Sequence, residues 1–111
     1  MKIEGDAKLL RIFVGESEKF HKIPVYEKLV QEARKKGLAG ATVLKGVMGF
    51  GKHSIIHTSK ILALSEDLPL VIEIVDQTDK IEDFIKVVGQ LFEEGNCKGL
   101  ITVEKVHVIN Y

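Results

Sequence analysis

The chain has 111 residues, of which 45% are hydrophobic and 29% charged, a balance typical of a globular domain. Sixteen basic and sixteen acidic residues cancel, so the basic excess of a dedicated nucleic-acid-binding protein is absent. No apolar run approaches the roughly 20 residues of a membrane span, and the N-terminus lacks the apolar core of a signal peptide. The single cysteine, Cys97, cannot form an internal disulfide. We therefore expect a cytoplasmic protein with one domain over residues 1–111.

The first half of the chain predicts a strand, a helix and a second strand. Residues 8–15 (KLLRIFVG) are apolar and partly β-branched, which favours a strand, and a polar loop follows. Pro24 suits the first turn of a helix, and apolar residues at helical spacing continue until Gly37 ends it. Residues 40–48 (GATVLKGVM) then predict the second strand.

The second half predicts a strand, a helix and a last strand, with a possible short strand before them. A mixed segment with a possible short strand at residues 60–64 (KILAL) comes first, and residues 69–76 (PLVIEIVD) are the most strand-like run of the chain. Asp79 and Glu82 resemble a capping box at the start of a helix. A clean apolar stripe follows: Ile81, Phe84, Ile85, Val88, Leu91 and Phe92.

Residues 99–109 (GLITVEKVHVI) predict the last strand. Its apolar phase runs through Ile101 and Val103 and then shifts to Val106 and Val108. A β-bulge near residues 104–105 would explain this shift.

The order β-α-β-β-α-β predicts an α+β, ferredoxin-like fold, with a four-stranded antiparallel sheet and two helices on one face. The other face is expected to be polar, yet Val71 and Val75 flank Glu73 on that side of the third strand. Both faces of the sheet then carry apolar side chains, and the helices bury only one of them. We therefore expect another copy of the chain to pack on the open face. The alternative is that residues 60–64 and the C-terminal tail fold over it.

The stretch GVMGFGKHS, residues 46–54, places three glycines where the second strand ends. Glycine there serves either a tight turn or the close approach of a ligand to the backbone. Exposed N–H groups around Gly49 and Gly51 could bind an anion such as phosphate, with Lys52 adding a positive charge. The pattern matches neither the Walker motif nor the dinucleotide-binding motif.

The segment GATVLKGVMGFGKHSIIHTSKILALSEDLPLVIEIVD resembles the PII-like family of uncharacterised small bacterial and archaeal proteins. That family is similar to the PII nitrogen-signalling proteins, and the likeness covers nearly the whole chain. The resemblance implies a homotrimer that binds an adenine nucleotide (AMP, ADP or ATP) in clefts between subunits. It further implies a T-loop, here residues 49–68, that changes shape with the nucleotide and docks on a regulated protein. Relatives encoded beside fluoride exporters suggest a membrane transporter as that partner.

The resemblance also assigns residues to the site. Residues 40–43 match the strand near the adenine, residues 49–51 match the T-loop base beside the phosphates, and residues 95–99 occupy the place of a second phosphate loop. Lys52 stands where PII proteins have arginine, and the two C-terminal arginines of PII proteins are absent. The nucleotide-binding residues predicted in this way are Thr42, Val43, Gly49, Phe50, Gly51, Lys52, His53, Val75, Lys98 and Gly99.

Other chemistry finds little support in the sequence. No set of nucleophile, base and orienting group is apparent, so we expect no enzymatic activity and assign no catalytic residue. His53 and His57 have a metal-binding spacing if that stretch is helical, but no cysteine or carboxylate cluster lies nearby, and we expect no required metal. A metal-binding, ferredoxin-like trimer of the divalent-cation-tolerance type is the alternative function.

Overall fold

The computed structural model describes residues 4–50, 57–58 and 67–111 of the chain. In chain order its elements are β1 (Gly5–Gly15), β2 (Lys19–Phe20), β3 (Ile23–Pro24), α1 (Val25–Lys35), β4 (Thr42–Lys45), β5 (Met48–Gly49), β6 (His57–Thr58), β7 (Pro69–Asp76), α2 (Thr78–Glu94) and β8 (Leu100–Val108). The predicted strand at residues 60–64 lies outside the described residues.

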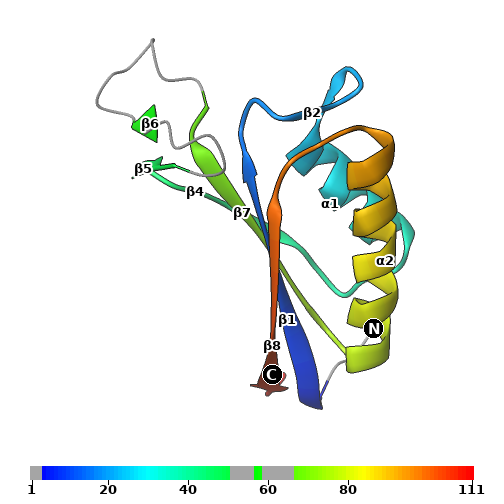
Figure 1. Ribbon diagram of the computed structural model, residues 1–111. Helices are drawn as coiled ribbons and strands as arrows, with labels where there is room; N and C mark the ends of the chain where they lie inside the picture. Colours follow the sequence, from blue (N-terminus) through cyan, green and yellow to red (C-terminus); the bar gives the residue numbers. More distant parts are fainter. Residues whose placement is uncertain (1–3, 51–56, 59–66) are drawn as a thin grey trace.

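The long strands form one antiparallel sheet in the order β4-β7-β1-β8, and both helices lie on the same side of it (Figure 1). This arrangement confirms the predicted ferredoxin-like fold. The short strands form two hairpins outside the main sheet, β2 with β3 and β5 with β6.

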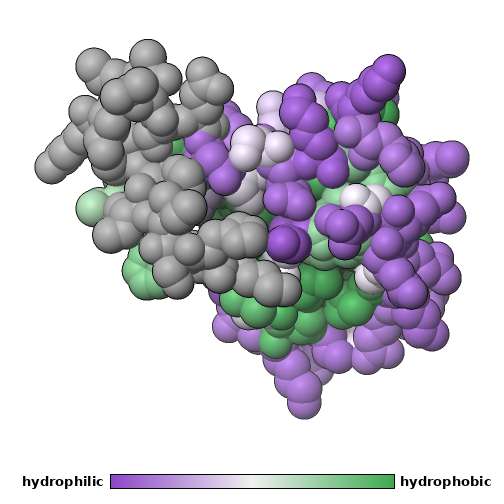
Figure 2. All heavy atoms as spheres, turned by 45° about the horizontal axis from the view of Figure 1, so that its top comes forward, coloured by the Kyte–Doolittle hydropathy of each residue, from purple (hydrophilic) through white to green (hydrophobic). Residues whose placement is uncertain are grey.

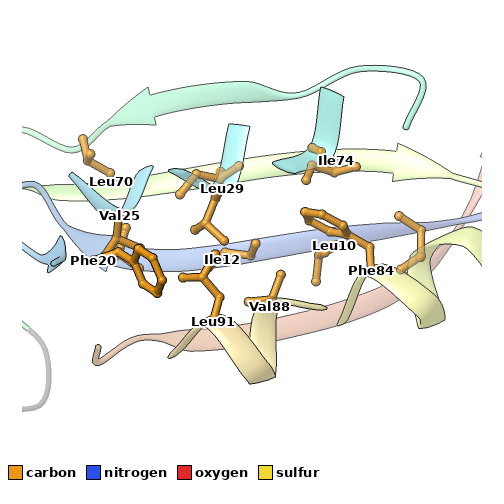
Figure 3. Close-up of a cluster of buried hydrophobic side chains, with 14 residues drawn as sticks. Leu10, Ile12, Phe20, Val25, Leu29, Leu70, Ile74, Phe84, Val88 and Leu91 are labelled. Atoms are coloured by element: carbon orange, nitrogen blue, oxygen red, sulfur yellow. The ribbon is translucent and has the colours of Figure 1, made fainter. Parts of the chain in front are cut away.

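The hydrophobic core lies between the sheet and the helices (Figure 3). Strands β1 and β7 turn alternate side chains toward the helices, because successive side chains of a strand point to opposite faces. Figure 3 shows Leu10 and Ile12 of β1 facing Leu29 of α1 and Val88 of α2. The remaining members of the buried cluster are Val14, Phe20, Val25, Ala33, Leu70, Ile72, Ile74, Ile81, Phe84 and Leu91.

Both helices follow the predicted apolar stripes. In α1 the buried residues are Val25, Leu29 and Ala33, and in α2 they are Ile81, Phe84, Val88 and Leu91. Helix α1 ends where Gly37 adopts a φ of 77°, a left-handed conformation that glycine reaches without steric cost.

Four local predictions were wrong, and the first three concern a loop, a strand and a helix cap. The polar loop after β1 contains the β2–β3 hairpin, and the strand predicted over residues 40–48 is two strands, β4 and β5. The capping box at Asp79 does not form: Gln77 is the N-cap residue of α2, and no side chain caps the helix there.

The bulge predicted in the last strand does not form either. The pairing of β1 with β8 keeps one register from Gly5 opposite Val108 to Phe13 opposite Leu100. Ile101 and Val103 lie opposite Ile12 and Leu10 and therefore face the helices, whereas Val106 and Val108 belong to the other face. The change of phase is thus a change of the apolar face along a regular strand.

Candidate nucleotide site

The predicted residues of β4 and β7 lie on neighbouring strands. Thr42 is opposite Glu73 and Val43 is opposite Ile72. Residues directly opposite each other share a face of the sheet, so Thr42 lies with Glu73 and Val75 on the open face, and Val43 lies on the helix face. Thr42 and Val43 are both exposed because β4 is an edge strand.

The glycines after β4 have a partner within the protein. A Cβ atom added to Gly46 would lie 2.8 Å from Cγ of Pro69, and one added to Gly49 would lie 3.0 Å from the same atom. The Gly46 amide also donates a 2.7 Å hydrogen bond to the Pro69 carbonyl oxygen. The bare backbone at both positions therefore serves the close approach of Pro69.

Phe50 follows directly, and its side chain is 66% exposed and lies outside the core. Gly49 pairs with His57 through β5 and β6, which gives the base of the predicted T-loop the form of a narrow hairpin. The predicted site residues Gly51, Lys52 and His53 lie outside the described residues.

The base of this loop is fixed to the end of β1. The Glu16 amide donates to the Leu68 carbonyl oxygen at 2.9 Å, and the Ser17 amide donates to Oδ1 of Asp67 at the same distance. Lys45, the last residue of β4, forms a 2.9 Å ion pair with Glu16. The two strands that enclose residues 46–68 are therefore both held against the β1–β2 turn.

Lys98 and Gly99 lie at the opposite edge of the sheet, just before β8. A Cβ atom on Gly99 would lie 2.6 Å from the ring of Phe92 and 2.8 Å from the Phe13 carbonyl oxygen, so packing accounts for this glycine. The Lys98 amide already donates a 3.0 Å hydrogen bond to the Glu18 carboxylate. A phosphate could use this amide only by displacing Glu18.

One chain does not bring these groups together. Strands β4 and β8 are separated by β7 and β1, and three interstrand spacings amount to roughly 14 Å. Gly49, Phe50, Lys98 and Gly99 nevertheless lie at the same end of the sheet, because the end of β4 and the start of β8 flank the end of β1 (Figure 1).

An apolar groove of about 250 Å³ lies where α1 leads into β4. Segment 38–41 forms one wall, and Arg34 is the only charged residue in the lining. Gly40 and Ala41, which the resemblance places near the adenine, belong to this wall, and no sequence motif marks the other lining residues. The lining residues are Val30, Ala33, Arg34, Leu38, Ala39, Gly40 and Ala41.

The open face of the sheet combines apolar side chains with one ionic cluster. The Arg11 side chain donates to Glu73 at 2.9 Å and also pairs with Glu104, and these hydrogen bonds, first that to Glu73, raise the pKa of Arg11. Two residues further along β1, on the same face, a row of apolar side chains crosses the four strands. It consists of Leu44, Val71, Phe13 and Leu100. Leu44 and Leu100, at the ends of the row, are 49% and 60% exposed.

Apolar surface is also visible in the space-filling view. Figure 2 shows a green area at the lower centre, bordered on the right by hydrophilic side chains.

Within the described ranges no group of three or more His, Cys, Asp or Glu side chains is placed to hold a metal ion. His57 lies in β6, so the helical spacing proposed for a metal pair is not present at that residue. No described helix is long and apolar enough to cross a membrane.

Comparison with solved structures identifies the fold. CPII, a nitrogen regulatory PII-like protein from Thiomonas intermedia bound to ADP, AMP and bicarbonate, superposes with a TM-score of 0.69 at 18% identity, over 93% of this chain and 88% of that chain. A putative PII-like signalling protein from Thermus thermophilus has a TM-score of 0.62 at 19% identity, over 97% and 94% of the two chains. The chain therefore has the fold of PII-like proteins.

Comparison of sequences identifies the family. A UPF0166 protein of Aquifex aeolicus is 42% identical over 102 residues, 92% of each chain, and a UPF0166 protein of Methanocaldococcus jannaschii is 34% identical over 92% of this chain and 91% of its own. The sequence profile of the DUF190 family, described as "Uncharacterized ACR, COG1993", matches residues 7–108. The chain belongs to this DUF190 family.

Proposed function

We propose that the protein is a PII-like sensor that binds an adenine nucleotide between neighbouring subunits of a homotrimer and regulates a partner through the loop of residues 49–68. The observation that carries the proposal is the division of the predicted site between the two edges of one sheet. In one chain the β4 and β8 edges are roughly 14 Å apart, too far for residues at both edges to contact the same phosphate. In the proposed trimer the β4 edge of one copy meets the β8 edge of another.

Relatives of the same fold support the ligand class. CPII is bound to ADP, AMP and bicarbonate in its solved structure, and it superposes on 93% of this chain. In our proposal the base lies by the groove at Gly40 and Ala41, beside Thr42 and Val43, with Val75 close on the neighbouring strand. The phosphates lie beside residues 49–53, and Lys98 and Gly99 come from the adjacent subunit.

The open face supports the assembly. Its row of apolar side chains, Leu44, Val71, Phe13 and Leu100, has no cover among the described elements, since both helices lie on the other side. A second copy would remove this surface from water, and apolar burial is the main source of free energy in such an association.

The proposed role is regulatory, with no catalytic residue. Binding can bias the loop only if the nucleotide has different affinities for its two shapes. The hairpin of β5 and β6, fixed at its base by Pro69, Asp67 and Leu68, would transmit the change from the phosphates to the docking surface. The sequence resemblance suggests a membrane transporter as the regulated partner.

Isothermal titration calorimetry with AMP, ADP, ATP and cyclic AMP tests the proposal. We expect saturable binding of at least one of AMP, ADP and ATP at one site per chain. Lys52→Ala should weaken that binding about tenfold, the usual effect of losing a hydrogen bond to a charged group. Lys86→Ala removes an exposed lysine from α2 and serves as the matched control.

Absence of heat with every nucleotide, in a folded protein, would contradict the sensor function. Stoichiometric binding of zinc or copper under the same conditions would favour the metal-binding alternative.

A further inference from the structure

Asp76, the last residue of β7, is the one charged side chain that is fully buried in the described part of the chain. Aspartate is almost never fully buried unless its charge is paired or hydrogen-bonded, because removing a carboxylate from water is costly. The Asp76 carboxylate therefore needs hydrogen-bond partners. They lie in the segment that leads from α1 to β4 and at the start of α2.

The Asp76 carboxylate holds the backbone of both directly. Oδ2 accepts a 3.0 Å hydrogen bond from the Ala39 amide, and Oδ1 accepts a 2.7 Å bond from the Gln77 amide. Bonds from amides to a charged acceptor are about twice as strong as bonds between neutral groups.

Lys80, one helical turn after Asp76, holds the segment between α1 and β4 at a second point. Its Nζ donates a 2.7 Å hydrogen bond to the Gly37 carbonyl oxygen and lies 4.0 Å from Oδ2 of Asp76. Gly37 is thus tied to α2 through Lys80, and Ala39 is tied to the end of β7 through Asp76, on either side of Leu38.

This segment is also a wall of the apolar groove. Leu38, Ala39, Gly40 and Ala41 line the groove opposite residues of α1, and β4 begins at the next residue. The contacts of Asp76 and Lys80 consequently fix the position of a surface to which neither side chain belongs.

We propose that Asp76 and Lys80 are positioning residues that hold segment 37–41 in the shape required for binding in the groove. The inference rests on the proposed function, because it takes an adenine nucleotide as the ligand. When segment 37–41 is already ordered in the free protein, less of its conformational entropy is lost on binding. Asp76 and Lys80 therefore raise the affinity without contacting the nucleotide.

Hydrogen exchange in the ligand-free protein tests the first step. Asp76→Asn removes the charge and presents an amide group of nearly the same size, so we expect exchange at the Ala39 amide to accelerate about tenfold or more. Asp79→Asn makes the same chemical change three residues later, at an exposed position, and should leave Ala39 unaffected. Unchanged protection of Ala39 in Asp76→Asn would overturn the proposal.

Titration with AMP and ADP tests the second step. Asp76→Asn and Lys80→Met should each weaken binding about tenfold, and Lys80→Arg should restore it, since arginine keeps a donor for the Gly37 carbonyl. Val88→Ala, a cavity in the core away from the groove, should lower stability without this loss of affinity. Equal weakening by Val88→Ala, or full affinity in Asp76→Asn and Lys80→Met, would overturn the role in binding.

The two levels of failure are distinguishable. If the wild-type protein binds neither AMP nor ADP, the role of the pair in binding these ligands is overturned along with the function proposed for them. Exchange at Ala39 is measured without ligand and still reports whether Asp76 holds the segment.

Discussion

Gly46 occupies a position where a side chain would collide with backbone and ring atoms of Pro69. A Cβ there would lie 2.8 Å from Cγ and 3.2 Å from the carbonyl oxygen of Pro69, closer than side-chain carbon atoms normally approach. We expect Gly46→Ala to lower the free energy of unfolding by roughly 1–3 kcal/mol, the usual cost of overpacking. Urea unfolding at fixed protein concentration measures the change.

Gly89 provides the matched control for this substitution. It lies within α2, and nothing comes within 4 Å of an added Cβ. Gly89→Ala should therefore stabilise the protein by about 0.5–1 kcal/mol, because alanine favours the helix more than glycine does. A Gly46→Ala protein as stable as Gly89→Ala would contradict the steric role of Pro69.

Cys97 should react slowly with thiol reagents. Burial raises the pKa of its thiol, the Glu18 carboxylate raises it further, and Sγ lies 3.3 Å from the Lys19 carbonyl oxygen. A raised pKa leaves less thiolate at a given pH, so alkylation by iodoacetamide near pH 8 should be slower than for free cysteine, and should accelerate as pH rises. Glu18→Gln should increase the rate; an alkylation rate equal to that of free cysteine would contradict this account.

These residues also show the limits of a sequence read locally. The spacing of Gly46, Gly49 and Gly51 suggested either a turn or a ligand, and both interpretations looked for the cause near the glycines themselves. In the structure, Pro69 of the neighbouring strand β7 lies so close to Gly46 and Gly49 that a side chain at either position would collide with it. Only the pairing of β4 with β7 brings these residues together.

The long elements were predictable because their signals are local and repeated. The β7 bounds, Pro69–Asp76, match the predicted run, and α2 follows its apolar stripe from Ile81 to Leu91. Each such element combines several residues that point to the same face, so one exception does not obscure the pattern.

Errors occurred where one or two residues carried the signal. The predicted cap at Asp79 was wrong because the preceding strand continues into the buried Asp76, which leaves Gln77 as the N-cap. The predicted bulge in β8 was wrong because an edge strand can present apolar residues to either face in turn. Neither outcome can be read from the residues of one element, since each depends on what the neighbouring element covers.

The whole molecule places the candidate site in a way that a motif cannot describe. The resemblance supplied the residues of the site, but the strand order β4-β7-β1-β8 puts Thr42 and Val43 on one edge and Lys98 and Gly99 beside the other, with Val75 on β7 between them. The groove lies between α1 and segment 38–41, and no motif marks its α1 residues. The resemblance predicted a site between subunits, but distances across a sheet depend on pairing between distant strands, so the separation of these residues within one chain became apparent only with the fold.

Assembly is the property of the whole molecule on which the proposed site depends. Val71 lies on the open face between Phe13 of β1 and Leu44 of β4. We expect the wild-type protein to have three times the 12.4 kDa chain mass by size-exclusion chromatography with light scattering. Val71→Glu should yield single chains with an unchanged circular dichroism spectrum, because a carboxylate on this face is tolerated in water but not in an apolar interface.

Two further variants make the assembly test specific to the open face. Leu44→Glu, at the edge of the same apolar row, should also yield single chains, whereas Ile23→Glu, in the β2–β3 hairpin beside α1, should leave the assembly intact. Nucleotide binding should disappear with the assembly in Val71→Glu and Leu44→Glu, because the phosphate-binding residues near the β4 edge of one copy and the β8 edge of another then no longer meet. Single chains that bind AMP or ADP with wild-type affinity would show instead that the site is complete within one subunit.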